Sequence, residues 1–104
     1  MMIDMNKLRR EFIRWMLLIT TNNNRAFGGT SESLLRQVVQ SEYADASAIE
    51  VRAELDYLEA RDLVKVSRHP GGHWSADITR WGIDIVEYAV DCDPGIARPK
   101  LTGL

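Results

Sequence analysis

The sequence is poor in cysteine and in long apolar runs. Cys92 is the single cysteine among 104 residues, so no internal disulfide can form, and a reducing compartment is the natural setting. The longest apolar run, residues 15–19, covers five residues, whereas a membrane-spanning helix needs about 20. No basic-then-apolar leader opens the chain. We therefore predict a cytoplasmic protein that neither crosses a membrane nor is secreted.

The sequence also lacks an excess of positive charge. Thirteen basic residues face fifteen acidic ones, giving a net charge of −2. Such a protein has no general attraction to phosphate, so any surface for nucleic acid must be local. The length and the 45% hydrophobic content suit one globular domain. We expect this domain over residues 1–92, followed over residues 93–104 by a C-terminal tail that lies over the surface or frays, because proline and glycine interrupt it.

Patterns typical of catalysis are missing as well. The sequence shows no paired carboxylates, metal-ligand cluster or nucleophile triad, so we predict that the protein is not an enzyme. His69 and His73 flank a turn, but their spacing to Asp77 or Cys92 matches no recognised zinc pattern. Cys92 has no base near it in sequence, because both histidines lie together elsewhere. We expect no metal and no cofactor.

Apolar periodicity predicts three helices in the first two thirds of the chain. The first covers residues 5–20, and its second half is apolar all round, which indicates burial or a covering second chain. The next begins at Thr30 or Ser31 and runs to about residue 43. The third covers residues 47–62, because Ser47 and Glu50 have the spacing of a capping box. Its buried stripe is formed by Val51, Leu55 and Leu58, and its outward positions are Glu50, Ala53, Asp56, Tyr57 and Ala60.

Two short strands and a last helix complete the pattern. Residues 63–68 and 73–78 alternate in polarity or are β-branched or aromatic, and a Pro-Gly-Gly turn separates them, so they predict a β-hairpin. Thr79 is suited to cap a helix that runs to about residue 91. A mainly α fold with a small β-hairpin, in the order helix, helix, helix, hairpin, helix, is typical of a winged helix-turn-helix.

A resemblance to known families is carried by the same segments. Residues 47–64 resemble the recognition helix and wing start of bacterial winged-helix regulators, with Asp62 where those proteins usually have glycine. Residues 30–100 more closely resemble a family of small winged-helix proteins encoded by Mu-like phages and prophages. The motifs that carry this likeness are residues 32–35, Arg52, Leu55, Leu58, residues 63–64, Trp74, Thr79, Gly82, residues 94–95 and residues 98–99. The resemblance implies a phage-derived DNA-binding protein that regulates transcription.

The charged residues give opposing indications about double-stranded DNA as the partner. The third predicted helix carries five acidic residues against two basic ones, a net charge of −3, whereas groove-binding helices are usually basic. The predicted hairpin, in contrast, has basic residues and no acid from residue 63 to 76. The expected DNA contacts are Arg36, Gln40, Ser47, Arg52, Tyr57, Lys65, Arg68, His69 and His73. The alternative is a protein–protein interaction module whose acidic helix, residues 47–62, docks on a basic partner.

The first and last predicted helices each have a second apolar side. Such helices need more than one packing partner, and we expect a homodimer joined through both of them. Trp15, Trp81 and Tyr88 could instead line a ligand pocket, although aromatic residues at helical spacing more often pack in a core or an interface. The expected interface residues are Phe12, Trp15, Ile19, Trp81, Ile85 and Tyr88.

Overall fold

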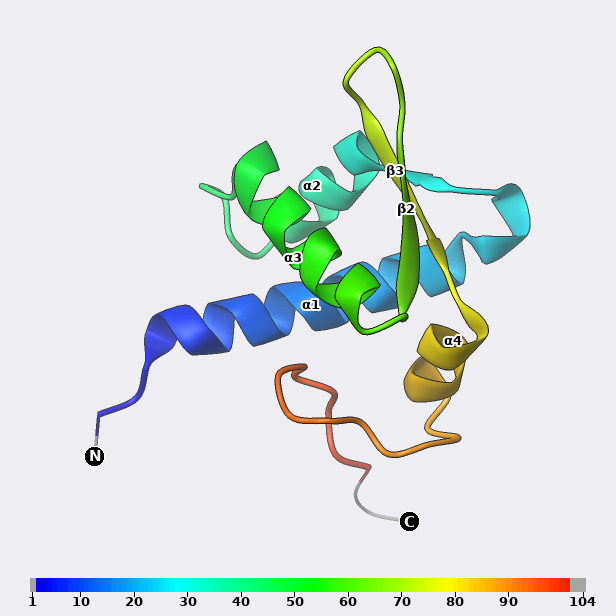
Figure 1. Ribbon diagram of the computed structural model, residues 1–104. Coiled ribbons are helices and arrows are strands. Elements are labelled where there is room, and N and C mark those ends of the chain that lie inside the picture. Colours follow the sequence, from blue (N-terminus) through cyan, green and yellow to red (C-terminus); the bar gives the residue numbers. More distant parts are fainter. Residues whose placement is uncertain (1, 102–104) are drawn as a thin grey trace.

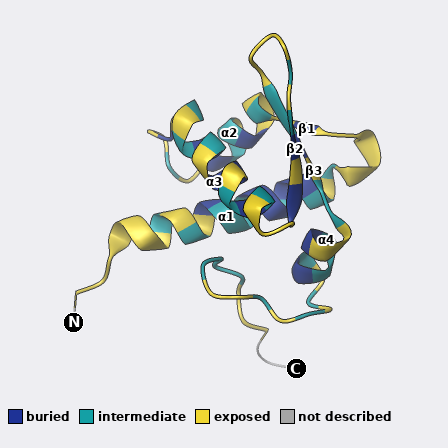
Figure 2. Cartoon of the chain, in the orientation of Figure 1, coloured by how far each residue is buried: buried dark blue, intermediate teal, exposed yellow. Residues whose placement is uncertain are grey.

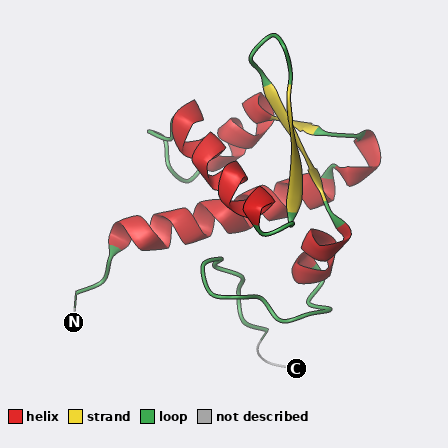
Figure 3. Cartoon of the chain, viewed as in Figure 1, coloured by secondary structure: helices red, strands yellow, loops and turns green. Residues whose placement is uncertain are grey.

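The computed structural model describes residues 2–101, which fold into a mainly helical body with a small antiparallel sheet (Figure 1). Figure 3 shows the hairpin rising from a group of helices that pack against one another. The described elements are α1 (Met5–Asn23), the 3-10 turn η1 (Arg25–Phe27), β1 (Thr30–Ser31), α2 (Glu32–Gln40), α3 (Ala48–Ala60), β2 (Val64–Arg68), β3 (Trp74–Ile78) and α4 (Arg80–Val86). The predicted mainly α class with a hairpin is confirmed, and the element order is compatible with a winged helix.

Side-chain caps start the four α-helices. Ser47 Oγ accepts a hydrogen bond from the Glu50 amide (3.1 Å), and Thr79 Oγ1 accepts one from the Gly82 amide (3.1 Å). Each cap satisfies a backbone donor that the first helical turn leaves unpaired. Both predicted caps are confirmed. The Glu50 carboxylate, however, binds Arg9 of α1 instead of returning to its own cap.

The core lies where α1, α2 and α3 meet one face of the sheet (Figure 2). The stripe predicted for the third helix is confirmed, because Val51, Leu55 and Leu58 are all fully buried. The other fully buried large side chains come mainly from α1 and α2. They are Ile13, Leu17, Leu18, Leu35 and Val39, together with Val64 and Thr21, which are 2% and 1% exposed.

The sheet has a strand that the sequence did not predict. Strand β1 pairs with β3 through Thr30 and Ala76 and through Ser31 and Ser75, which gives the strand order β1-β3-β2. Because β1 is only two residues long, it is too short to display an alternating pattern. It joins the start of α2 to the hairpin and so fixes the hairpin against the helices.

The helix ends differ from the predicted ones by a few residues. Helix α3 ends as expected before Asp62, which adopts φ 60°, while the Leu63 amide donates to the Leu58 carbonyl (3.0 Å), as in a Schellman motif. Helix α1 extends beyond the predicted end, and α2 ends before residue 43. Helix α4 stops at Val86 instead of residue 91, because Tyr88 also adopts φ 60°, which ends the regular helix.

The C-terminal segment packs against the body, so of the two expected courses, lying over the surface or fraying, residues 95–98 follow the first. The Ala97 amide donates to the Glu11 carbonyl of α1 (3.1 Å). Arg98 Nη1 donates to the carbonyls of Ile85 and Val90 (3.0 and 2.9 Å) and so satisfies acceptors at the end of α4. Residues 102–104 of the predicted tail lie outside the described residues. Within residues 2–101, no helix combines the length and the apolar character needed to cross a membrane.

Candidate nucleic-acid interface

Two arginines meet one indole ring where the hairpin contacts α3. The guanidinium carbons of Arg52 (α3) and Arg68 (β2) lie 4.6 and 4.5 Å from the ring centroid of Trp74 (β3). At this distance the quadrupole of the ring attracts each cation. We call Arg52, Arg68 and Trp74 the arginine–tryptophan cluster. It gathers two predicted DNA contacts at one place.

Carboxylates neutralise both arginines of this cluster. Arg52 forms a bidentate pair with Glu32 of α2, and its Nη2 also donates to the Gly72 carbonyl in the hairpin turn (2.6 Å). Arg68 Nη2 donates to Asp56 (2.6 Å) and to Glu59 (3.0 Å) of α3. The hydrogen bonds to Glu32 raise the pKa of the Arg52 guanidinium group, and those to Glu59 and Asp56 raise the pKa of the Arg68 guanidinium group. The hairpin is thereby tied to α2 and α3 by charge-assisted hydrogen bonds.

Solvent still reaches these ion pairs. The side chains of Arg52, Arg68 and Asp56 are 33%, 44% and 54% exposed. Ion pairs this accessible contribute little to stability, because water screens them. An incoming anion can therefore replace Asp56 at Arg68 at small cost, whereas Glu32 is only 13% exposed and would lose its partner in the fold if an anion displaced it from Arg52.

The hairpin turn brings the two histidines together. The rings of His69 and His73 stack with centroids 4.5 Å apart, and His69 Nε2 lies 3.0 Å from Ser75 Oγ. The His69 amide donates to the His73 carbonyl (3.0 Å), which closes the turn. Lys65 is exposed on β2 and forms no ion pair with any residue from 2 to 101. Lys65 is thus the cation of the hairpin that is free to bind an anion.

Other predicted contact residues have roles inside the fold. Gln40 Nε2 donates to the Ala46 carbonyl (2.8 Å) and so holds the link between α2 and α3. The ring of Tyr57 contacts the guanidinium groups of Arg14 (3.4 Å) and Arg61 (3.7 Å), both measured to its centroid. Ser47 is the cap of α3, as described above, and Arg36 is half-buried on α2.

The negative charge of α3 is balanced by arginines from elsewhere in the chain. Arg9 Nη2 lies 2.7 Å from Glu50, and Arg14 Nε lies 2.8 Å from Glu54. The charge of −3 counted along the helix therefore overstates the field at its surface, because it omits these partners. The buried Glu54 is a feature that the sequence reasoning missed. Its position three residues after Val51, beside Leu55, was the available signal.

The outward face of α3 combines small or apolar side chains with one carboxylate. Ile49 is 81% exposed at the start of the helix, and Ala53, Asp56 and Ala60 follow it along the exposed side. Among these residues no side chain donates a hydrogen bond, and Asp56 can accept one only from a base donor such as the cytosine amino group, so the face has little capacity to read base edges directly.

The residues predicted for a dimer interface fall into two groups. Phe12 and Trp81 are exposed, and Trp15 and Ile19 are half-buried. The prediction that Ile85 lies at the interface is wrong, because this residue is 3% exposed within the core and cannot reach a second chain. Tyr88 is half-buried, and its hydroxyl donates to the Pro99 carbonyl (2.5 Å).

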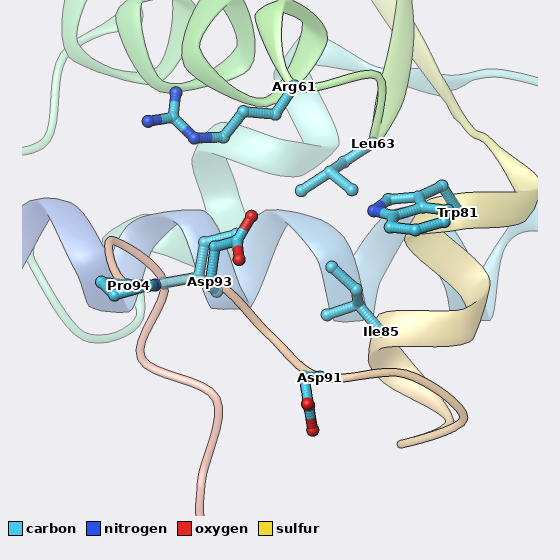
Figure 4. A pocket seen from close by; sticks show the side chains of 8 residues that line it. Arg61, Leu63, Trp81, Ile85, Asp91, Asp93 and Pro94 are labelled. Atoms are coloured by element: carbon cyan, nitrogen blue, oxygen red, sulfur yellow. The ribbon is translucent and has the colours of Figure 1, made fainter.

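A pocket of about 290 Å³ opens between the end of α3, helix α4 and the C-terminal segment (Figure 4). It is lined by Arg61, Leu63, Trp81, Ile85, Asp91, Asp93, Pro94 and Ile96. Of the aromatic residues considered for a ligand pocket, Trp81 lies here, whereas Trp15 and Tyr88 do not. Over residues 2–101, no three histidine, cysteine or acidic side chains are grouped as a metal site would require.

Comparisons of this chain with protein-family models, curated proteins and solved structures found no match. The likeness to Mu-like phage proteins therefore stays a prediction from the residues that carry it.

Proposed function

We propose that this chain is a winged-helix domain that binds double-stranded DNA, with β2 and β3 as the wing and α3 facing the groove. The observation that carries the proposal is the arginine–tryptophan cluster, which places two guanidinium groups together, partly exposed, where wing and helix meet. In protein–DNA complexes, arginine and lysine side chains supply many of the contacts to phosphate oxygens.

The carboxylates that hold this cluster stand where phosphates would bind. A guanidinium group presents the same fork of donors to a carboxylate as to a phosphate. On binding, phosphate oxygens would displace Asp56 from Arg68 and would contact the exposed part of Arg52 beside its pair with Glu32, while Lys65 would bind without any exchange. In the free protein, acidic residues thus neutralise the arginines of the cluster, and DNA would compete with these acidic residues for the arginines.

This arrangement favours positioning contacts over base reading. The exposed face of α3 offers Ile49 and two alanines, which can contact thymine methyl groups, and Asp56, which can accept only from a base donor such as the cytosine amino group. We therefore expect binding that depends steeply on salt and weakly on sequence. A role in transcriptional regulation within a phage or prophage is part of the proposal through the family resemblance alone.

The first test is fluorescence anisotropy of a labelled duplex, repeated from low to physiological salt. Replacing Lys65 and Arg68 together by alanine should weaken binding for every duplex and reduce the salt slope by roughly two units, since each lost phosphate contact removes about 0.9. Arg80→Ala is the matched control, because Arg80 is an exposed arginine that begins α4, and Figure 1 shows α4 at the end of β3 opposite to the hairpin turn. Absence of binding by the wild-type chain at low salt would refute the proposal.

A second variant tests the exchange of anions directly. Asp56→Asn removes a competitor for Arg68 and should tighten DNA binding by roughly three- to tenfold, which corresponds to about 1 kcal/mol. Asp84→Asn makes the same change beside Arg80 on α4 and should leave the affinity unaltered. Weaker binding of the Asp56→Asn variant would contradict the exchange.

A protein–protein module is the second candidate, and the exposure of Ile49 favours it. An isoleucine that is 81% exposed beside alanines is suited to docking on an apolar partner surface. Ile49→Lys separates the candidates. It should tighten DNA binding if α3 faces the groove, because a new cation meets phosphates, and it should leave DNA binding unchanged if this face serves a protein.

A further inference from the structure

Exposed apolar side chains concentrate at the N-terminal end of the described chain. Of the ten large hydrophobic residues that are exposed within residues 2–101, five lie between residues 2 and 12: Met2, Ile3, Met5, Leu8 and Phe12. Figures 1 and 2 show this half of α1 extending beyond the body, with exposed residues predominating along it. An apolar concentration of this kind marks an interaction surface.

The apolar residues of α1 form a stripe on one side of the helix. At 100° per residue, Met5, Leu8, Phe12, Met16 and Ile19 fall within an arc of roughly 80°. Ile13, Leu17 and Thr21, which face the core, lie roughly 140° away around the helix. The stripe therefore belongs to a second face, which the fold of one chain leaves partly uncovered.

The spacing of this stripe is symmetric about Phe12. Leu8 and Met16 lie four positions before and after it, and Met5 and Ile19 lie seven positions before and after it. When two such helices pack antiparallel about a two-fold axis at Phe12, each apolar position meets an apolar position. A closed two-fold interface requires this self-complementarity, whereas a different partner would not.

A hollow beside the stripe can receive side chains from the second helix. Phe12 and Met16 of α1 and residues 41–43, which follow α2, line a pocket of about 430 Å³. In the antiparallel pairing, Leu8 of the second copy lies opposite Met16 and reaches this pocket. The pairing would extend over about 21 Å of helix.

We propose that two copies of this chain dimerise through α1, packed antiparallel about Phe12. The interface then consists of Met5, Leu8, Phe12, Met16 and Ile19, with Trp15 at its edge, and α4 has no part in it. Met2 and Ile3 lie beyond the stripe and lengthen the contact along the second copy, toward the roughly 1,000 Å² that a specific interface needs. The inference rests on α1 and the pocket beside it and is tested without DNA, so it stands or fails independently of the proposed function.

Sedimentation velocity over a concentration series provides the first test. The wild-type chain should pass from monomer to dimer as its concentration rises, and Phe12→Glu should shift the dissociation constant upward at least 100-fold, because it places two carboxylates at the two-fold axis. Phe27→Glu is the matched control, since Phe27 is also an exposed phenylalanine but lies outside α1. Circular dichroism checks that both variants remain folded. A wild-type chain that stays monomeric into the millimolar range would overturn the proposal.

Thiol cross-linking tests the register. In a Cys92→Ser background, Phe12→Cys should cross-link to itself through a short bis-maleimide. Met5→Cys should not cross-link to itself but should cross-link to Ile19→Cys when the two are mixed. Self-cross-linking of Met5→Cys would indicate a parallel pair and overturn the proposal. A monomer that binds anionic phospholipid vesicles through Phe12 would overturn it too, by assigning the stripe to a lipid surface.

Discussion

Arg14 connects three parts of the chain that are distant in sequence. Its Nε donates to Glu54 of α3 (2.8 Å), its Nη1 donates to the Gly95 carbonyl (2.8 Å), and its guanidinium group lies 3.4 Å from the ring centroid of Tyr57. The side chains of Arg14 and Glu54 are 11% and 6% exposed, so water screens their interaction little. Removing one partner of such a pair leaves the other charge buried without compensation.

Arg14→Met retains much of the side-chain volume and removes the charge. We expect it to lower the free energy of unfolding by about 3–5 kcal/mol, a large share of the roughly 5–15 kcal/mol available to a domain of this size. At about 4–8 °C for each kcal/mol, the melting temperature should fall by at least ~12 °C. The double variant Arg14→Met with Glu54→Leu should recover most of this loss, because it removes both charges and fills the site with apolar atoms.

Urea unfolding followed by circular dichroism measures these differences, with calorimetry for the melting temperatures. Arg10→Met is the control, because Arg10 is exposed on the same helix and forms no ion pair within residues 2–101. It should change the free energy of unfolding by no more than about 0.5 kcal/mol. A loss below about 1 kcal/mol for Arg14→Met, or no recovery in the double variant, would refute the reasoning about the buried pair.

Three further predictions concern single sites. The amide of Val66 and the guanidinium group of Arg68 lower the folded-state pKa of Glu59 from its ordinary value of 4.5. The stability that results is present above pH 4.5 and is lost as the pH falls through the lower folded-state pKa. Acid titration should therefore destabilise the wild type more than the Glu59→Gln variant. Gly82→Ala should lower the free energy of unfolding by about 1–3 kcal/mol or more, because the added Cβ would meet the backbone carbonyl of the residue before β2. An unchanged melting temperature would contradict this packing. Burial raises the pKa of the Cys92 thiol, so iodoacetamide should alkylate it more slowly in the folded chain than in urea, and equal rates would count against the burial.

The elements that the sequence predicted well are those with a local cause. Ser47 and Thr79 cap their helices through hydroxyl groups that bind amides three residues ahead. The buried stripe of α3 follows from helical periodicity alone. Asp62 ends α3 because aspartate tolerates the left-handed conformation. In each case the cause and its effect lie within one or two turns of the chain.

The features that were not predicted from the sequence depend on partners that lie far apart along the chain. Arg9 and Glu50 are separated by 41 positions, and Arg14 and Glu54 by 40. A charge count along one helix cannot include partners that only the folded chain brings near, so the helix looked more acidic than its surface is. The short strand β1 was missed for the same reason, because two residues become a strand only through pairing with β3.

Helix α1 links the two proposals physically. Arg9 and Arg14 bind acidic residues of α3, while the stripe centred on Phe12 lies on another side of the same helix. If two chains pair through that stripe, these ion pairs fix the position of each α3 relative to the two-fold axis. The separation of the two wings then follows from the register of α1, and two arginine–tryptophan clusters act on one duplex at a fixed spacing. In such a dimer, a surface whose individual cations are mostly neutralised would gain affinity for DNA through paired binding instead of through the charge of one domain.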